Sequence, residues 1–198
     1  MGWINNLGEL RSSALKEIAN IGISHAATAI GEITKEDITI SLPNLKTFSR
    51  QEVMIAEIDG GKVAGGYLTV QGISEYTETL ILLSEDNARK LMDKFVSVDT
   101  SQLSTEEQKS VFSEVITVIA STYFSAIGGM FNLRINHSIP KVSFNNGAIS
   151  DFVKTTLKNH EGISIDTTLT SKDTRMHLLF LLIPDPNTLD GFFKAIGI

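Results

Sequence analysis

Apolar residues recur at helical spacing over two long stretches, at about residues 7–33 and from about residue 105 to residue 130. Ser104, followed three residues later by Glu107, is typical of a capping box at the start of the second stretch, and Gly128-Gly129 indicates its end. Short runs of β-branched and aliphatic residues, bounded by turn formers, follow each stretch. We therefore expect strands at residues 38–42, 53–58, 63–70, 77–83, 135–139, 142–144, 163–170 and 175–183, and short helices at 85–95, at 148–160 and from Asn187.

The two long stretches are related by a shift of 97 residues, which places Thr28-Ala29-Ile30-Gly31 on Ser125-Ala126-Ile127-Gly128 and Pro43 on Pro140. Leu82-Leu83 falls on Leu181-Leu182 after a further gap of two residues. Matching segments in the same order indicate an internal repeat. We expect an α+β fold with pseudo-two-fold symmetry, in which each half is a long amphipathic helix followed by strands and a short helix. The strands should form one shared sheet with the long helices packed on it. This predicts a single domain, residues 1–198, made of repeats at about 7–96 and 104–198 and joined by a polar linker at 97–105.

Each long helix carries a narrow polar stripe opposite its apolar face. At about 100° per residue, Glu17, Asn20 and Ser24 lie within about 40° of Ser13. Ser110, Glu114, Thr117 and Ser121 repeat this stripe on the second helix. We expect both stripes to face solvent on a convex surface that offers no pocket. A solvated helix face is the ordinary explanation of such a stripe, so chemistry would require a substrate brought by a partner.

Composition narrows the possible chemistry. The chain has 198 residues, no cysteine and a net charge of −6, which excludes disulfides and thiol chemistry and argues against nucleic acid as the main partner. The four histidines are dispersed without metal-ligand spacing, so we expect no metal site, and His25 should be half-buried on the first helix. The longest apolar run, residues 178–183, is too short to cross a membrane. We expect a soluble cytoplasmic protein.

The spacing of the stripe resembles a known family. Ser13, Glu17 and Asn20, followed after 22 intervening residues by Pro43, resemble the signature of the chemotaxis phosphatases that include CheC, CheX and FliY. The string LKEIANIGISHAATAIGEI is similar to the corresponding helix of CheC, and the duplicated layout is similar over essentially the whole chain.

The resemblance implies an enzyme that dephosphorylates CheY, a response regulator phosphorylated on an aspartate. It assigns docking to Glu17, through the regulator's active-site lysine, and orientation of the attacking water to Asn20, with Ser13 and Pro43 in supporting roles. The regulator supplies Mg²⁺ and the acyl phosphate, so no cofactor is expected on this chain. CheD is a second partner known in the family.

The sequence departs from the family pattern at three positions. The second half keeps Ser110, Glu114 and Pro140, but Thr117 replaces the expected Asn, which predicts a degenerate site and one competent site in the chain. Ala19 and Ile23 replace small residues of the family string, and Ile23 adds bulk beside the motif. These departures leave an alternative open, a non-catalytic adaptor that binds a response regulator or CheD. Two faces in one chain favour a monomer.

Overall fold

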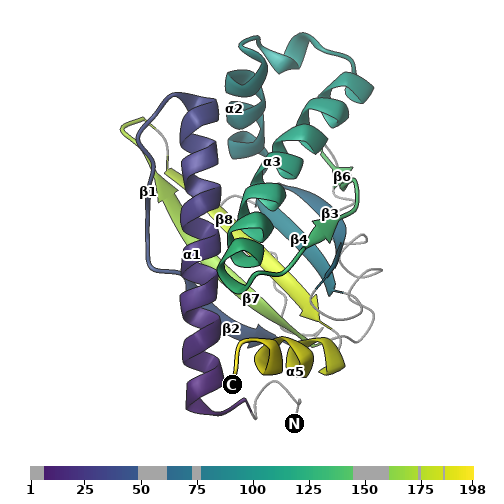
Figure 1. Ribbon diagram of the computed structural model, residues 1–198. Coiled ribbons are helices and arrows are strands. Elements are labelled where there is room, and N and C mark those ends of the chain that lie inside the picture. The colour runs from purple at the N-terminus through teal and green to yellow at the C-terminus, as the bar shows by residue number, and fades with distance from the viewer. Residues whose placement is uncertain (1–6, 49–61, 73–76, 145–160, 174, 185) are drawn as a thin grey trace.

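The structure is a computed structural model that describes residues 7–48, 62–72, 77–144, 161–173, 175–184 and 186–198 (Figure 1). A layer of helices covers one face of a curled sheet, and the described chain begins and ends near the same end of the molecule. In chain order the elements are α1 (Gly8–Thr34), β1 (Thr39–Ile40), β2 (Asn44–Phe48), β3 (Val63–Gln71), β4 (Thr77–Ser84), α2 (Glu85–Val96), a 3₁₀ turn (Thr100–Gln102), α3 (Thr105–Phe131), β5 (Asn136–His137), β6 (Lys141–Ser143), β7 (Gly162–Thr170), β8 (Arg175–Pro184) and α5 (Pro186–Ala195).

The two halves contain the same elements in the same order, as the repeat predicts. α1 and α3 are both 27 residues long and begin at Gly8 and Thr105, an offset of 97 residues. β3 and β7 begin at Val63 and Gly162, an offset of 99, which agrees with the predicted gap of two residues. The mixed α+β architecture is confirmed, and the matching offsets are consistent with a duplication.

The strands of the two halves interlock in one antiparallel sheet. Its order is β1-β7-β8-β4-β3-β5, with β2 also paired to β7 and β6 to β3. Ile40 of β1 pairs with Leu169 of β7, and the equivalent residue His137 of β5 pairs with Val70 of β3. Each half therefore supplies edge strands to the other, and β4 and β8 join the halves at the centre through pairs such as Ile81 with Phe180.

The main core lies between the sheet and the helices. Because successive strand residues point to opposite faces, Ile81 and Leu83 of β4 face the helices, while Leu80 and Leu82 belong to a smaller cluster on the other face. Tyr123 of α3 stacks on Phe180 of β8, with ring centroids 4.7 Å apart. Both rings are buried in the main core.

α3 is long and apolar enough to cross a membrane, judged by length and composition alone. Its most apolar 18-residue window has a mean hydropathy of 1.5, and half of that window is buried inside the protein. A core helix meets the same test, and α3 packs against α1 and against strands of the sheet. Burial against the rest of the fold accounts for its apolar character.

Several sequence predictions are corrected by the structure. His25 is exposed rather than half-buried, because the buried arc of α1 is rotated toward α3 and includes Ala19, Ile23 and Ala27. β2 was not predicted, and the strand expected at 135–139 is limited to Asn136–His137. α3 continues past Gly128-Gly129 to Phe131. The strand predicted at 53–58 and the helix predicted at 148–160 lie outside the described residues.

Candidate functional site

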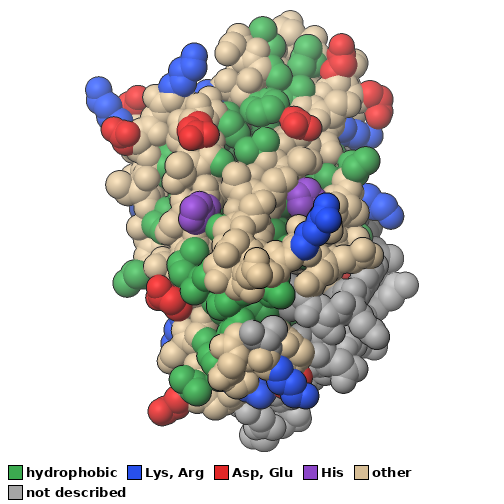
Figure 2. All heavy atoms as spheres, in the orientation of Figure 1, with side chains coloured by type: hydrophobic (Ala, Val, Ile, Leu, Met, Phe, Trp, Pro, Cys, Tyr) green, Lys and Arg blue, Asp and Glu red, His purple; other side chains and the backbone are tan. Residues whose placement is uncertain are grey.

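The polar stripe of α1 lies on the outer surface of the helix layer. Ser13 and Glu17 are exposed, whereas Asn20 and Ser24 are half-buried. Acidic and histidine side chains are visible on this face of the molecule in Figure 2. The prediction that the stripe faces away from the core is therefore correct, with Asn20 nearer to the buried side than Glu17.

The polar groups of Glu17 and Asn20 differ from the neighbouring hydroxyls in their hydrogen bonding. Within the part of the chain that the structure describes, neither side chain makes a hydrogen bond or an ion pair. Ser24 instead donates its hydroxyl to the backbone carbonyl of Asn20 at 2.7 Å, and Thr28 donates to the carbonyl of Ser24 at 3.0 Å. The neighbouring hydroxyls are thus occupied by the helix backbone, while the carboxylate and the carboxamide, about one turn apart, are not.

The opposite side of α1 fixes the orientation of the stripe. Leu15, Ile18 and Ala19 are buried in the core and line an apolar cavity of about 70 Å³. Tyr123 and Phe124 of α3 close the cavity from the neighbouring helix. Since its walls are almost entirely apolar, the cavity offers no site for a phosphate.

Ala19 and Ile23 do not reach the surface that carries the motif. Ala19 is 2% exposed and Ile23 is fully buried. The bulk of Ile23 is therefore accommodated in the core, and it does not alter the outer contour beside Asn20.

Pro43 belongs to the short connection between β1 and β2. It is half-buried, and both flanking strands contact α1 and pair with β7. The fold thus brings the edge segment that carries Pro43 alongside the helix that carries Glu17 and Asn20.

The second face has the same layout with different chemistry. Ser110 and Glu114 are exposed, Thr117 and Ser121 are half-buried, and Pro140 is buried. The hydroxyl of Thr117 donates to the carbonyl of Ser113 at 2.8 Å. The polar group at the position equivalent to Asn20 is therefore turned back to the helix and occupied.

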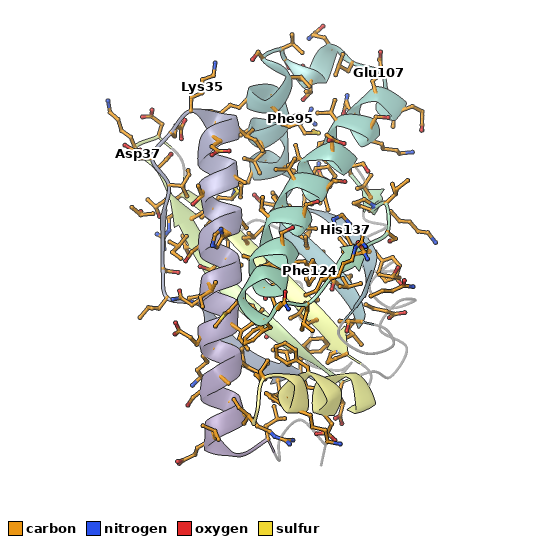
Figure 3. The ribbon with its side chains drawn as sticks, in the orientation of Figure 1. Lys35, Asp37, Phe95, Glu107, Phe124 and His137 are labelled. Carbon is orange, nitrogen blue, oxygen red and sulfur yellow. The ribbon has the colours of Figure 1, made fainter. Side chains whose placement is uncertain are left out.

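A contact between Ser121 and His137 marks the second face and was not predicted from the sequence. Ser121 Oγ lies 2.8 Å from His137 Nε2, and His137 Nδ1 lies 2.9 Å from the carbonyl of Ser138 (Figure 3). A carbonyl can only accept, so Nδ1 carries the proton, and in the neutral ring Nε2 accepts from the serine. The equivalent position in the first half is Ile40, which cannot make this bond.

Metal ligation has no support in the described part of the chain. Among those residues, no group of three or more His, Asp or Glu side chains is placed to hold a metal ion. The outer face of α1 presents instead the carboxylate of Glu17 and the carboxamide of Asn20, which have no polar partner among the described residues.

Comparison with known proteins identifies the same helix. The model of the CheC-like family matches residues 10–46, a segment that contains Ser13, Glu17, Asn20 and Pro43. The CheY-P phosphatase CheC of Bacillus subtilis is 23% identical over 211 aligned positions, which cover all of this chain and 99% of that protein.

Solved structures share the fold over most of the chain. FliY of Thermotoga maritima superposes with a TM-score of 0.68 at 14% identity and covers 96% of both chains. CheX of Borrelia burgdorferi, solved in a CheX–CheY–BeF₃–Mg²⁺ complex, superposes with a TM-score of 0.56 at 12% identity over 83% of this chain and 96% of its own. In the matched motif segment, the full-length relative and the shared architecture, the chain is similar to the CheC/CheX/FliY family.

Proposed function

We propose that this protein dephosphorylates a phosphorylated response regulator of the CheY type. The observation that carries the proposal is the pair formed by Glu17 and Asn20, about one turn apart on the outer face of α1 and without partners among the described residues. The CheY-P phosphatase activity named for the Bacillus subtilis relative supports it. Such a substrate places the protein in the cytoplasm together with its regulator.

Asn20 is the residue that would orient the attacking water. Hydrolysis of an aspartyl phosphate requires a water held in line with the bond that breaks, and a carboxamide can both accept and donate a hydrogen bond to hold it. Because the regulator contributes the acyl phosphate and the Mg²⁺ that neutralises it, this chain needs neither a nucleophile nor a metal of its own. A convex helix face is the shape that can enter another protein's active site.

Glu17 is the docking residue of the proposed complex. Its exposed carboxylate lies about one turn from Asn20 and can pair with the lysine beside the regulator's phosphorylation site. Ser13 precedes it by another turn, and Pro43 ends the loop alongside, so both have supporting positions at the rim.

The second face is proposed to lack turnover. Thr117 has no carboxamide, and its hydroxyl is bonded to the carbonyl of Ser113. Ser110, Glu114 and Pro140 keep their positions, so this face retains the groups assigned to docking without the group assigned to water positioning. One competent site per chain follows, and a monomer carries both faces.

The rival proposal is a non-catalytic adaptor that binds a response regulator or CheD. Thr117 favours it, since one of the two faces already lacks the carboxamide. Ile23 no longer favours it, because that side chain is buried.

The deciding experiment measures the decay of a phosphorylated CheY-type regulator with and without the protein. We expect wild type to accelerate the decay, and Asn20→Ala to lose about a hundredfold of that acceleration. Asn136→Ala, which removes an exposed carboxamide from β5, is the matched control and should retain the wild-type rate. Tight binding of the regulator without any acceleration would instead support the adaptor.

A further inference from the structure

Two tripeptides related by the repeat have the same structure at opposite edges of the sheet. Ser41-Leu42-Pro43 connects β1 to β2, and Ser138-Ile139-Pro140 connects β5 to β6. The family signature includes the prolines, but it leaves the serine and the aliphatic residue before each of them unexplained.

Each serine is bonded twice to the neighbouring strand. The backbone N–H of Ser41 donates to the Thr168 carbonyl at 2.9 Å, and the Thr168 N–H donates to Ser41 Oγ at 2.9 Å. Ser138 makes the same pair of bonds with Thr69, at 2.9 and 3.1 Å. Thr168 and Thr69 are themselves equivalent in the repeat, so both halves build the same clamp.

The clamp holds an aliphatic side chain in solvent. Leu42 is 86% exposed and Ile139 is 85% exposed, the two highest values among the large apolar residues that the structure describes. The following proline restricts the backbone of each residue to extended conformations, which removes further freedom. Single exposed apolar residues are common on protein surfaces, but here a repeated set of bonds presents one at the same place in both halves.

The segments that carry both aliphatic residues lie against the helices of the polar faces. Ser113 Oγ contacts the Pro140 carbonyl at 3.5 Å, which brings the residue after Ile139 to the residue before Glu114. In the first half, β1 and β2, which flank Leu42, both contact α1. The helix of each polar stripe is thus contacted by the edge segment that holds one exposed aliphatic side chain.

We propose that Leu42 and Ile139 are apolar docking anchors for the receiver domain of the response regulator. This inference rests on the proposed function for its choice of partner, and CheX, which has the same fold, has been solved in a complex with CheY. Two polar side chains cannot cover the roughly 800 Å² that each partner contributes to a specific interface, so additional contacts around them are needed. Buried apolar anchors supply much of the affinity in such interfaces, while the carboxylate and carboxamide fix the orientation.

The first test compares Leu42→Ser with Val98→Ser. Val98 is 51% exposed and lies in the connection between α2 and the 3₁₀ turn, so its substitution removes an exposed apolar group from a segment outside both tripeptides and both polar stripes. We expect Leu42→Ser to raise KM for the phosphorylated regulator about tenfold with little change in kcat, and to raise Kd for the beryllofluoride-bound regulator by the same factor. Thermal unfolding should be the same for both variants and wild type, because neither side chain is buried.

The second test counts regulators per chain by calorimetric titration with the beryllofluoride-bound regulator. We expect two binding events on wild type, and Ile139→Ser should weaken one of them about tenfold. A single event that Ile139→Ser leaves unchanged would overturn the assignment of the second anchor.

The two proposals fail in distinguishable ways. If wild type accelerates dephosphorylation and Leu42→Ser has wild-type KM and Kd, the anchor is overturned while the phosphatase stands. If wild type binds the regulator without accelerating decay and Leu42→Ser weakens that binding, the anchor stands while catalysis is overturned. If wild type does not bind the regulator at all, both are overturned.

Discussion

Gly22 of α1 lies directly against the ring of Tyr123 of α3. A Cβ added at Gly22 would stand 2.5 Å from Tyr123 Cε2 and 2.7 Å from Cδ2, closer than real side chains approach. Tyr123 is itself 1% exposed and stacked on Phe180, and burial raises the pKa of its hydroxyl. The ring therefore has little freedom to move aside. The close approach of the two helices sets the position of α1 two residues from Asn20.

We expect Gly22→Ala to lower the free energy of unfolding by about 1–3 kcal/mol, since the added methyl group overpacks the contact between the helices. Gly129→Ala is the control, because a Cβ at Gly129 of α3 would meet nothing within 4 Å. That change should raise stability by about 0.5–1 kcal/mol through the ordinary preference of helices for alanine. Urea denaturation of the two variants measures both effects. Equal free energies of unfolding for Gly22→Ala and wild type would contradict the prediction, because they would show that α1 and α3 can move apart to admit the methyl group without loss of stability.

Much of the fold can be predicted from the sequence because its signals are local or repeated. The capping box at Ser104 and Glu107 is found where it was predicted, and Ser84 caps α2 directly before the helix predicted at 85–95. The left-handed residues that end the long helices are Lys35 and Asn132, whereas the glycines at 128 and 129 were expected to end the second. β2 (Asn44–Phe48) depends on pairing with β7, more than a hundred residues away, so its own sequence gives little indication of it.

The candidate site also has features that the sequence predicts and features that it does not. The polar stripe that contains Glu17 and Asn20 follows from helical spacing, and its direction away from the core needs only the position of the apolar face. His25 was misplaced because α3 packs beside α1 and rotates the buried arc, which a single helix cannot reveal. The clamps at Ser41 and Ser138 were missed because their bonding partners lie on other strands.

Glu17→Gln should raise KM for the phosphorylated regulator about tenfold with a smaller effect on kcat, because it removes the charge that pairs with the regulator's lysine. Salt should raise the KM of wild type more steeply than that of the variant, since only wild type has the screened attraction. Glu32→Gln, which changes an exposed carboxylate on the same helix, is the matched control. Parallel salt dependence for wild type and Glu17→Gln would contradict the docking role.

Glu107 makes the stability of the α3 start depend on pH. Hydrogen bonds from the side chain and the backbone N–H of Ser104 hold the pKa of the Glu107 carboxyl below its usual value (Figure 3). A lowered folded-state pKa means that the stabilisation is complete above the unfolded-state pKa of about 4.5 and is lost as pH falls through the folded value. Glu107→Gln should therefore be less stable than wild type at pH 7, and the difference in the free energy of unfolding should shrink below about pH 4.5.

Glu106→Gln is the control for general loss of charge at this turn, because the Glu106 carboxylate pairs with Lys109 and not with Ser104. A stability difference that stays constant from pH 7 to pH 3 would contradict the assignment.

Thr117→Asn should create turnover at the second face when the first is disabled. The position has the exposure and spacing of Asn20, and Ser110, Glu114 and Pro140 are already in place around it. Asparagine would replace a hydroxyl that is bonded to the Ser113 carbonyl with a carboxamide long enough to reach beyond the helix surface. In the Asn20→Ala background we expect Thr117→Asn to raise the rate of regulator dephosphorylation about tenfold. The rate should stay below that of wild type, because the second face also carries the Ser121–His137 bond, which the first face lacks. Thr117→Ala in the same background controls for loss of the hydroxyl and should remain inactive. If the Asn variant is as inactive as the Ala variant while still binding the regulator, a carboxamide on this face is not sufficient for catalysis, and the proposed role of Asn20 would need a further group that α3 lacks.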